Sequence, residues 1–236
     1  MSFNPADPAP GRAGHAQQDT KNRLLDAAER LFAERGFEGT SVRAVTRAAA
    51  ASVSAANYHF GSKEALLHAA LVRRLEPLNR RRLECLTSAE RAAGGGPVSV
   101  EAIVEAFLRP GFEARRSLQA DQASYRHIAA RLYTDPHGMV SSLKAELFGP
   151  VIGRFLDALG RALPDRSLEE LALGFQFLIG VMVHVISSHE GGSERQQSPS
   201  AIADDQLLDC MISFTAAGLR AASRAGDAGH RSGGRK

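Results

Sequence analysis

The 236-residue sequence has only two cysteines, Cys85 and Cys210, and they lie far apart. Two distant cysteines provide neither the disulfide framework of a small secreted domain nor the ligand spacing of a zinc site. We therefore expect a protein of a reducing compartment that holds no metal and no cofactor.

Long hydrophobic runs are also missing. The most apolar stretch, residues 171–186, is shorter than the roughly 20 residues that a membrane-spanning helix needs, and it contains Gln176 and His184. The N-terminus has no apolar stretch of signal-peptide length. We expect no membrane partner, a disordered arm over residues 1–18, and a disordered Gly/Arg/Ser-rich tail over residues 223–236.

Strand patterns are the third absence. No segment alternates apolar and polar residues convincingly, whereas helical spacing recurs along the chain. The sequence therefore predicts an all-α fold, in which Pro110-Gly111 interrupts one helix. Beyond the front of the chain, helices are expected near residues 99–116, 119–133, 138–162, 167–188 and 202–222.

The charge is unevenly distributed, although the formal net charge is only +3. Residues 12–82 hold 13 Lys/Arg against 7 Asp/Glu, and the remainder of the chain holds 16 against 19. A basic front indicates an anionic partner there. The alternative is that surface charges fall unevenly by chance.

Three helices are predicted at this basic front. The first begins at a cap on Thr20 and ends at Gly36, because glycine tolerates the left-handed backbone that closes a helix. A short second helix follows, and small residues at 50–52 form a turn. Ser52 caps a third helix over residues 53–60. Two short helices joined by a tight turn, after a longer helix, form a helix-turn-helix plan.

A fourth helix is predicted after Gly61, which ends the third. Ser62 caps it, and Glu64 suits the positive end of its dipole. Lys63 adds a cation beside free backbone N–H groups, an arrangement suited to a phosphate. The helix runs to about residue 90, and Pro77 is expected to kink it or to break one of its hydrogen bonds.

The third helix has two different sides at 100° per residue. Ala56 and Phe60 share the side expected to face the core, whereas Ser54, Asn57 and Tyr58 lie together on the opposite side. A hydroxyl, an amide and a phenol on an exposed helix suit base edges and phosphates in a DNA major groove. This pattern favours a nucleic-acid contact.

Other interpretations of these side chains are weaker but open. A catalytic His59 would need a serine or cysteine nucleophile with an acidic partner, or a second histidine at metal-ligand spacing, and the sequence offers neither. Tyr58 could pack against a neighbouring helix, and Lys63 could be a solvated charge. We expect no catalytic residue.

Four segments together resemble the DNA-binding domain of TetR/AcrR-type bacterial repressors. They are LLDAA at residues 24–28, LFAERGF at 31–37, TSV at 40–42 and YHFGSKEAL at 58–66. The resemblance covers about residues 20–70 and implies a helix-turn-helix domain over residues 19–66. The DNA contacts that it implies are Thr40, Ser41, Arg43, Val53, Ser54, Ala55, Asn57, Tyr58, His59 and Lys63.

Two positions depart from the family pattern. Ala50 stands where the family usually has a turn glycine, and this costs free energy if the backbone there is left-handed. Asn57 stands where a tyrosine commonly contacts phosphate, with Tyr58 directly after it. The Asn-Tyr-His-Phe sequence in the recognition helix predicts a subgroup of the family.

The resemblance implies a helical ligand-binding and dimerisation domain over residues 67–222. Helices 167–188 and 202–222 are the expected homodimer interface, because the first is apolar nearly all round; a fully internal core helix is the alternative. An unidentified small-molecule effector would bind elsewhere in this domain. Its expected lining is Phe107, Phe112, Tyr125, His127, Arg131, Phe175, Gln176 and His184.

The resemblance therefore implies a ligand-responsive transcriptional regulator of the bacterial cytoplasm and nucleoid. It would bind a near-palindromic double-stranded operator as a homodimer, as a repressor, and it would not be an enzyme. The effector would act by favouring a conformer in which the helix from residue 62 to 90 swings. The alternatives are an all-helical protein-interaction module and a small helical enzyme without DNA binding.

Overall fold

The computed structural model describes residues 10–117, 138–188 and 204–221. Every regular element in these ranges is a helix, which confirms the all-α prediction. The chain divides into two compact units, described separately below. The first unit takes residues 1–75 and 131–143, and the second takes residues 76–130 and 144–236.

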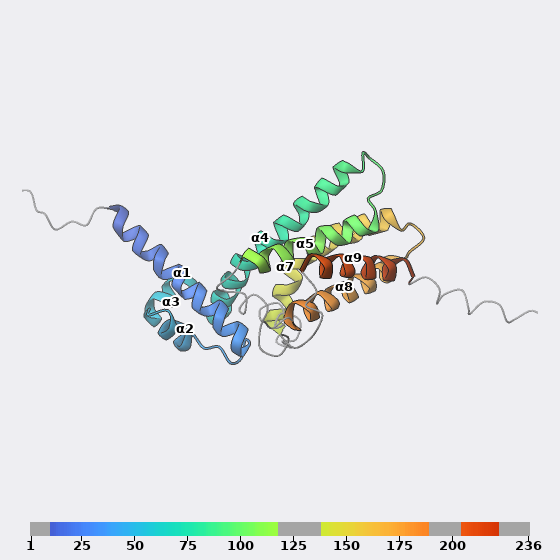
Figure 1. Ribbon diagram of the computed structural model, residues 1–236. Helices are drawn as coiled ribbons and strands as arrows, with labels where there is room; N and C mark the ends of the chain where they lie inside the picture. The colour runs from blue at the N-terminus through green and yellow to red at the C-terminus, as the bar shows by residue number, and fades with distance from the viewer. Residues whose placement is uncertain (1–9, 118–137, 189–203, 222–236) are drawn as a thin grey trace, which may run out of the picture. The chain divides into compact units, whose positions relative to one another are not determined.

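The helices are labelled in Figure 1. They are α1 (Pro10–Arg35), α2 (Val42–Ala48), α3 (Val53–Phe60), α4 (Lys63–Ala92), α5 (Val100–Ser117), α7 (Gly138–Ala162), α8 (Leu168–Ser188) and α9 (Asp204–Ala221). The helix predicted over residues 119–133 lies outside the described residues. Helix α1 begins at Pro10 and not at a cap on Thr20, because proline fits the first position of a helix, where its missing N–H is not needed.

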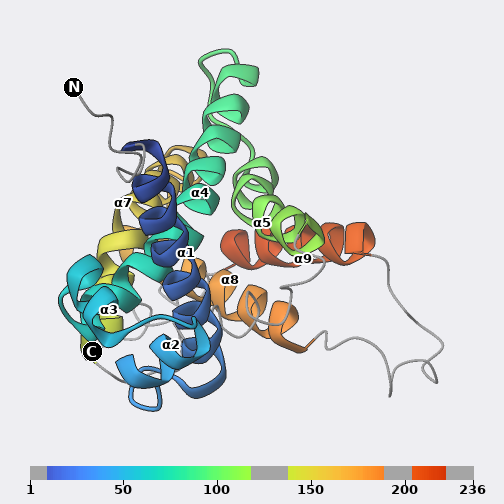
Figure 2. The same cartoon turned by 90° about the vertical axis from the view of Figure 1, so that its left-hand side faces the viewer.

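In the first unit, α1, α2 and α3 pack against one another (Figures 1 and 2). The apolar face of α1 is buried as its spacing predicts, and the start of α4 adds leucines to the same core. The buried side chains include Leu24, Ala28, Leu31, Phe32, Val45, Ala56, Leu66, Leu67 and Leu71. This packing holds two short helices that would not be stable alone.

Prolines lie inside three of the described helices: Pro77 in α4, Pro110 in α5 and Pro150 in α7. The predicted interruption at Pro110-Gly111 is wrong, since α5 runs unbroken from Val100 to Ser117. Buried apolar contacts of α5, including those with α9, outweigh the hydrogen bond that Pro110 cannot donate. Helix α4 likewise continues through Pro77.

In the second unit, α9 packs against both α5 and α8. Three aromatic rings meet in the interior: the centroid of Phe107 lies 5.2 Å from that of Phe155 and 4.8 Å from that of Phe175. The Arg82 guanidinium lies 4.0 Å from the Phe107 ring centroid and donates a 3.0 Å hydrogen bond to the Phe107 carbonyl. These side chains form the centre of a packed core.

Helix α8 is unusually apolar. Its residues 168–185 have a mean hydropathy of 1.5, so length and composition alone would allow this one described helix to cross a membrane. Core helices of soluble proteins pass the same test. Only 28% of this window is buried within the chain, so much apolar surface on α8 faces outward.

Candidate nucleic-acid interface

Three serines fix the starts of α2, α3 and α4. The Ser41 hydroxyl accepts a hydrogen bond from the Ala44 backbone N–H at 3.2 Å, at the start of α2. Ser52 and Ser62 cap α3 and α4 in the same way, with 3.0 and 3.1 Å bonds. Each cap satisfies a backbone donor that the first helical turn leaves free. The predicted caps at Ser52 and Ser62 are thus confirmed.

The turn between α2 and α3 carries backbone strain. Ala50 has a φ of 48°, in the left-handed region that disfavours residues with a Cβ. The Arg23 guanidinium of α1 donates to the carbonyl oxygens of Ala49 and Ala50 at 2.9 and 3.4 Å. An arginine on α1 therefore holds the turn that sets the direction of α3.

Helix α3 buries only one side. Ala56 is buried, whereas Ser54, Asn57 and Tyr58 are exposed together, with 76% of Tyr58 accessible. Phe60, expected in the core, is only half-buried. The exposed face therefore presents the hydroxyl, amide and phenol that the helical angles predict.

The contacts implied at the α1–α2 connection differ in accessibility. Ser41 and Arg43 are exposed, but Thr40 is 1% accessible and its hydroxyl donates to the Gly36 carbonyl at 2.7 Å. The Thr40 side chain thus braces the loop from within and does not lie on the surface. Of the remaining implied contacts, Val53 is exposed, and Ala55 and His59 are half-buried.

Lys63 opens α4 at the end of the recognition helix. Its ammonium nitrogen lies 4.0 Å from the centroid of the buried Phe37 ring. Attraction between a cation and a ring face restricts the side chain without neutralising its charge. The backbone N–H groups of the first turn of α4 lie beside it, so this end of the helix suits a phosphate.

Unpaired arginines of this unit concentrate on α2. No carboxylate of the described residues lies within 4.0 Å of Arg43 or Arg47, both of which are exposed. Arg47 was not predicted from the sequence, although its spacing of four from Arg43 is the available signal. By contrast, a carboxylate lies within 4.0 Å of Arg23, Arg30, Arg35, Arg73 and Arg74.

A second surface feature lies on the other unit, between α8 and α9. It is an apolar groove of about 680 Å³, lined by residues that include Leu173, Phe177, Phe214 and Leu219. Phe177 and Phe214 are 65% and 70% accessible. Side chains of this kind rarely gather on the outside of a soluble monomer without a partner.

The residues predicted to line an effector pocket fall into three groups. Phe107, Phe112 and Phe175 are buried, and the first and third of these contact each other in the core. Gln176 and His184 are exposed on α8, and Gln176 lines the apolar groove. Tyr125, His127 and Arg131 lie outside the described residues. The pocket stays a prediction.

The chain matches two family models. One, described as bacterial regulatory proteins, tetR family, matches residues 24–70. The other, described as tetracyclin repressor-like, C-terminal domain, matches residues 105–218. Together they cover the helix-turn-helix region and most of the second unit.

Individual bacterial regulators also resemble this chain. The HTH-type transcriptional repressor KstR2 of Rhodococcus jostii is 30% identical over 179 residues, 75% of this chain and 81% of that protein. The HTH-type transcriptional regulator UidR of Escherichia coli is 40% identical over 55 residues, which span 23% of this chain and 28% of UidR. A crystal structure of a TetR-family transcriptional regulator from Bordetella parapertussis shares the fold, with a TM-score of 0.60 at 18% identity over 83% of this chain and 93% of that one.

Proposed function

This chain belongs to the TetR family of bacterial regulatory proteins, and we propose that it is a DNA-binding transcriptional repressor responsive to a small molecule. It acts in the bacterial cytoplasm, on the nucleoid, as a homodimer on a near-palindromic operator. The observation that carries this proposal is the exposed face of α3, where Ser54, Asn57 and Tyr58 stand clear of the core.

The side chains divide into those that select sequence and those that hold the DNA backbone. Asn57 can pair in two-pronged fashion with adenine, and Ser54 can donate or accept at a base edge. Lys63 and the α4 N-terminus bind a phosphate, and Arg43 binds another from α2. The phenol of Tyr58 takes the phosphate contact that the family usually assigns one residue earlier.

The apolar groove between α8 and α9 is proposed as the homodimer interface. A second copy presents the same two helices, so Phe177 and Phe214 of each copy find an apolar surface to cover them. Two subunits then place two recognition helices about 34–36 Å apart, in successive major grooves. A near-palindromic operator mirrors that symmetry.

The effector acts through α4, which begins in the first unit and ends in the second. A ligand of the second unit that favours a different placement of α4 changes the separation of the recognition helices. It must bind that conformer better than the DNA-competent one, since only differential affinity shifts the equilibrium. The effector itself is unidentified.

Two substitutions test the division of roles. Lys63→Ala removes a phosphate contact, so it should weaken binding to all duplexes alike and flatten the salt dependence by about one counterion. Asn57→Ala should relax base preference at one position, at a cost of about 1–3 kcal/mol on the preferred operator. Selection from a random DNA pool identifies the operator, and fluorescence anisotropy at several salt concentrations measures both effects.

The outcome also separates the rival functions. Arg30→Ala is the matched control for Lys63→Ala, because Arg30 is an exposed cation of the same unit already paired with Glu34. If Lys63→Ala and Asn57→Ala both leave DNA binding unchanged, the assigned face is wrong. A wild-type protein that binds no duplex would favour a protein-interaction module.

Tyr58→Phe tests whether the phenol hydroxyl contributes to DNA binding, since this change removes one oxygen and keeps the ring.

A further inference from the structure

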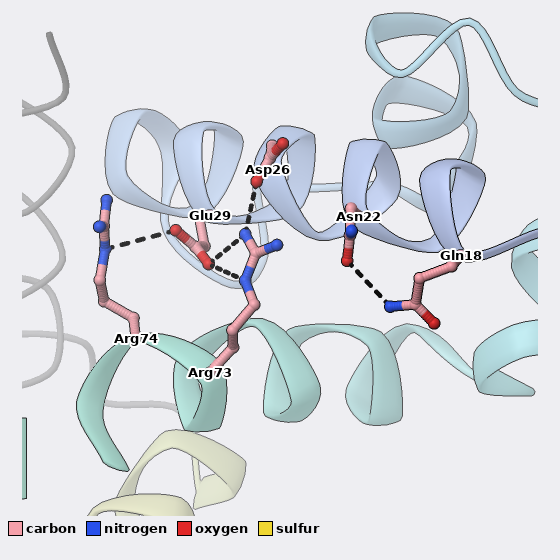
Figure 3. Close-up of polar contacts among 6 residues, drawn as sticks. All are labelled: Gln18, Asn22, Asp26, Glu29, Arg73 and Arg74. Atoms are coloured by element: carbon pink, nitrogen blue, oxygen red, sulfur yellow. Dashed lines mark hydrogen bonds and ion pairs between the residues drawn. The ribbon is translucent and has the colours of Figure 1, made fainter. Parts of the chain in front are cut away.

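Four charged side chains form a cluster between α1 and α4 within the first unit (Figure 3). Arg73 donates to one carboxylate oxygen of Glu29 from two nitrogens, at 3.0 and 2.6 Å, and to Asp26 at 2.6 Å. Arg74 approaches the other Glu29 oxygen at 3.4 Å. Glu29 is therefore the centre of the cluster, with both of its oxygens engaged by α4.

Glu29 is the most deeply buried of the four, with 5% of the residue accessible. A carboxylate at that depth is costly unless it is paired and hydrogen-bonded. Burial raises the pKa of Glu29, and the hydrogen bond from Arg73 opposes that rise. The charged state of Glu29 thus depends on α4 staying where it is.

The cluster ties this stretch of α4 to α1, and another contact does so nearer the start of α4. At the other, the Lys63 ammonium lies over the ring of Phe37, just beyond the end of α1. Glu29 faces Arg73 and Phe37 faces Lys63, so α1 and this part of α4 run antiparallel. The two contacts stand ten residues apart, about 15 Å along the helix.

Such a pair of contacts fixes both the position and the rotation of α4. If α4 shifted by one residue along its own axis relative to α1, every side chain of α4 would move by about 1.5 Å and turn by 100° about that axis. That movement would carry Arg73 away from both carboxylates and Lys63 away from the ring. The buried leucines of α4 oppose the same rotation, because it would turn them away from the core, so the charged contacts add to a register that packing also favours.

We propose that Glu29 is a positioning residue for DNA binding: through Arg73 and Arg74 it holds α4 in the one register that presents Lys63 and the α4 N-terminus to a phosphate. This rests on the proposed function. It assigns a role in DNA binding to a carboxylate that cannot itself contact DNA favourably.

The decisive experiment compares Glu29→Gln with Glu34→Gln, an exposed glutamate on the same helix paired with Arg30 and Arg35. Both changes remove one negative charge from the DNA-binding unit, so simple electrostatics predicts slightly tighter DNA binding in both. Positioning predicts the opposite sign for Glu29→Gln alone. We expect its affinity for a random duplex to fall roughly tenfold, the effect of losing one charged hydrogen bond.

A double-mutant cycle with Lys63→Ala shows whether Glu29 acts through Lys63. If it does, Glu29→Gln costs less affinity once Lys63 is gone, because only the contact of the α4 N-terminus is left to disturb, and both single variants flatten the salt dependence by about one counterion. A purely structural role would give additive losses and an unchanged salt slope. Melting curves establish that each variant is folded at the assay temperature.

Arg73→Lys provides a test that keeps the net charge and removes the planar fork. It should weaken DNA binding in the same direction as Glu29→Gln. The proposal is overturned if Glu29→Gln binds DNA as Glu34→Gln does, or if its loss is additive with that of Lys63→Ala. Failure of wild type and of Glu34→Gln to bind any duplex would instead reject the proposed function.

Discussion

Ala50 is the one described residue other than glycine that has a positive φ, and it is exposed. The left-handed conformation costs a residue with a Cβ roughly 1–2 kcal/mol, whereas glycine adopts it freely. The chain accepts this cost in the turn that orients the recognition helix. The hydrogen bonds from Arg23 help to hold the strained turn.

Replacing Ala50 by glycine should therefore stabilise the protein. We expect the free energy of unfolding to rise by about 1 kcal/mol, because no packed side chain is lost and the strain is relieved. Thermal or urea unfolding measures the change. Ala48→Gly is the matched control, since Ala48 is the exposed last residue of α2 and should lose at most about 1 kcal/mol. Equal losses in both variants would show that the turn is not strained.

At the scale of helices, α4 is the element whose sequence and structure conflict most openly. Pro77 lies inside this 30-residue helix and is exposed. It cannot donate the hydrogen bond to the carbonyl of Arg73, four residues earlier, and its ring crowds that carbonyl. The strain falls between the residues that α4 contributes to the first unit and those that it contributes to the second.

Pro77→Ala should strengthen α4. The added N–H can complete the helical ladder, and an exposed proline gives up little packing, so we expect a gain of about 1–3 kcal/mol in the free energy of unfolding. Circular dichroism during thermal unfolding measures the gain. Glu76→Ala changes the adjacent exposed residue and should have an effect within about 0.5 kcal/mol. A loss of stability in Pro77→Ala would mean that the second unit is built around the proline.

Helices α5 and α9 are joined at the surface by an ion pair that responds to pH. Arg220 donates to both oxygens of Glu101 at 2.6 Å, and these hydrogen bonds lower the pKa of Glu101 from its ordinary 4.5. A carboxylate with a lowered folded-state pKa stabilises the fold above the unfolded pKa. That stabilisation is lost as the pH falls through the folded-state value.

Glu101→Gln should therefore destabilise the protein at neutral pH and lose its effect in acid. Because both side chains are about half exposed, solvent screening keeps the difference from wild type below about 1 kcal/mol. Urea unfolding of both proteins from pH 7 to below pH 4.5 measures it. A difference that stays constant across this range would contradict the prediction.

At the scale of the whole molecule, the outward apolar surface of α8 and α9 is where we propose that a second copy binds. Phe177→Asp places a charge in the groove, which should cost several kcal/mol if a second copy covers it. We expect a monomer by analytical ultracentrifugation and a matching loss of operator affinity, since one subunit reaches only one half-site. Leu168→Asp is the control, because Leu168 is as exposed as Phe177 but does not line the groove. A dimeric Phe177→Asp protein would place the interface elsewhere.

Local chemistry made much of the first unit predictable. Serine caps, closing glycines such as Gly61 and the periodic leucines each act within a few residues, so the caps and helices follow from neighbours in the sequence. The same holds for the outward side of α3, because Asn57 and Tyr58 follow from helical angles alone. The family prediction also rested on this local pattern, and it is confirmed.

Contacts between residues that are far apart in the sequence explain most of the features that the sequence did not predict. The continuity of α5 through Pro110 follows from packing against α9. The buried Thr40 is a local exception, because its hydroxyl donates to the Gly36 carbonyl only four residues earlier. The pairing of Glu29 with Arg73 joins residues 44 apart. The residues next to Glu29 and Arg73 in the sequence do not predict this pairing.

The sequence by itself determined the helical class, the helix-turn-helix pattern and the side of α3 that faces away from the core, because these depend on periodicity and on capping within a turn. Only the tertiary structure decided which charges are paired, which aromatic rings fill the core and which apolar faces stay open. Those outcomes depend on which helices meet and in what register. That choice is made by the packing of whole faces and not by any local run of residues.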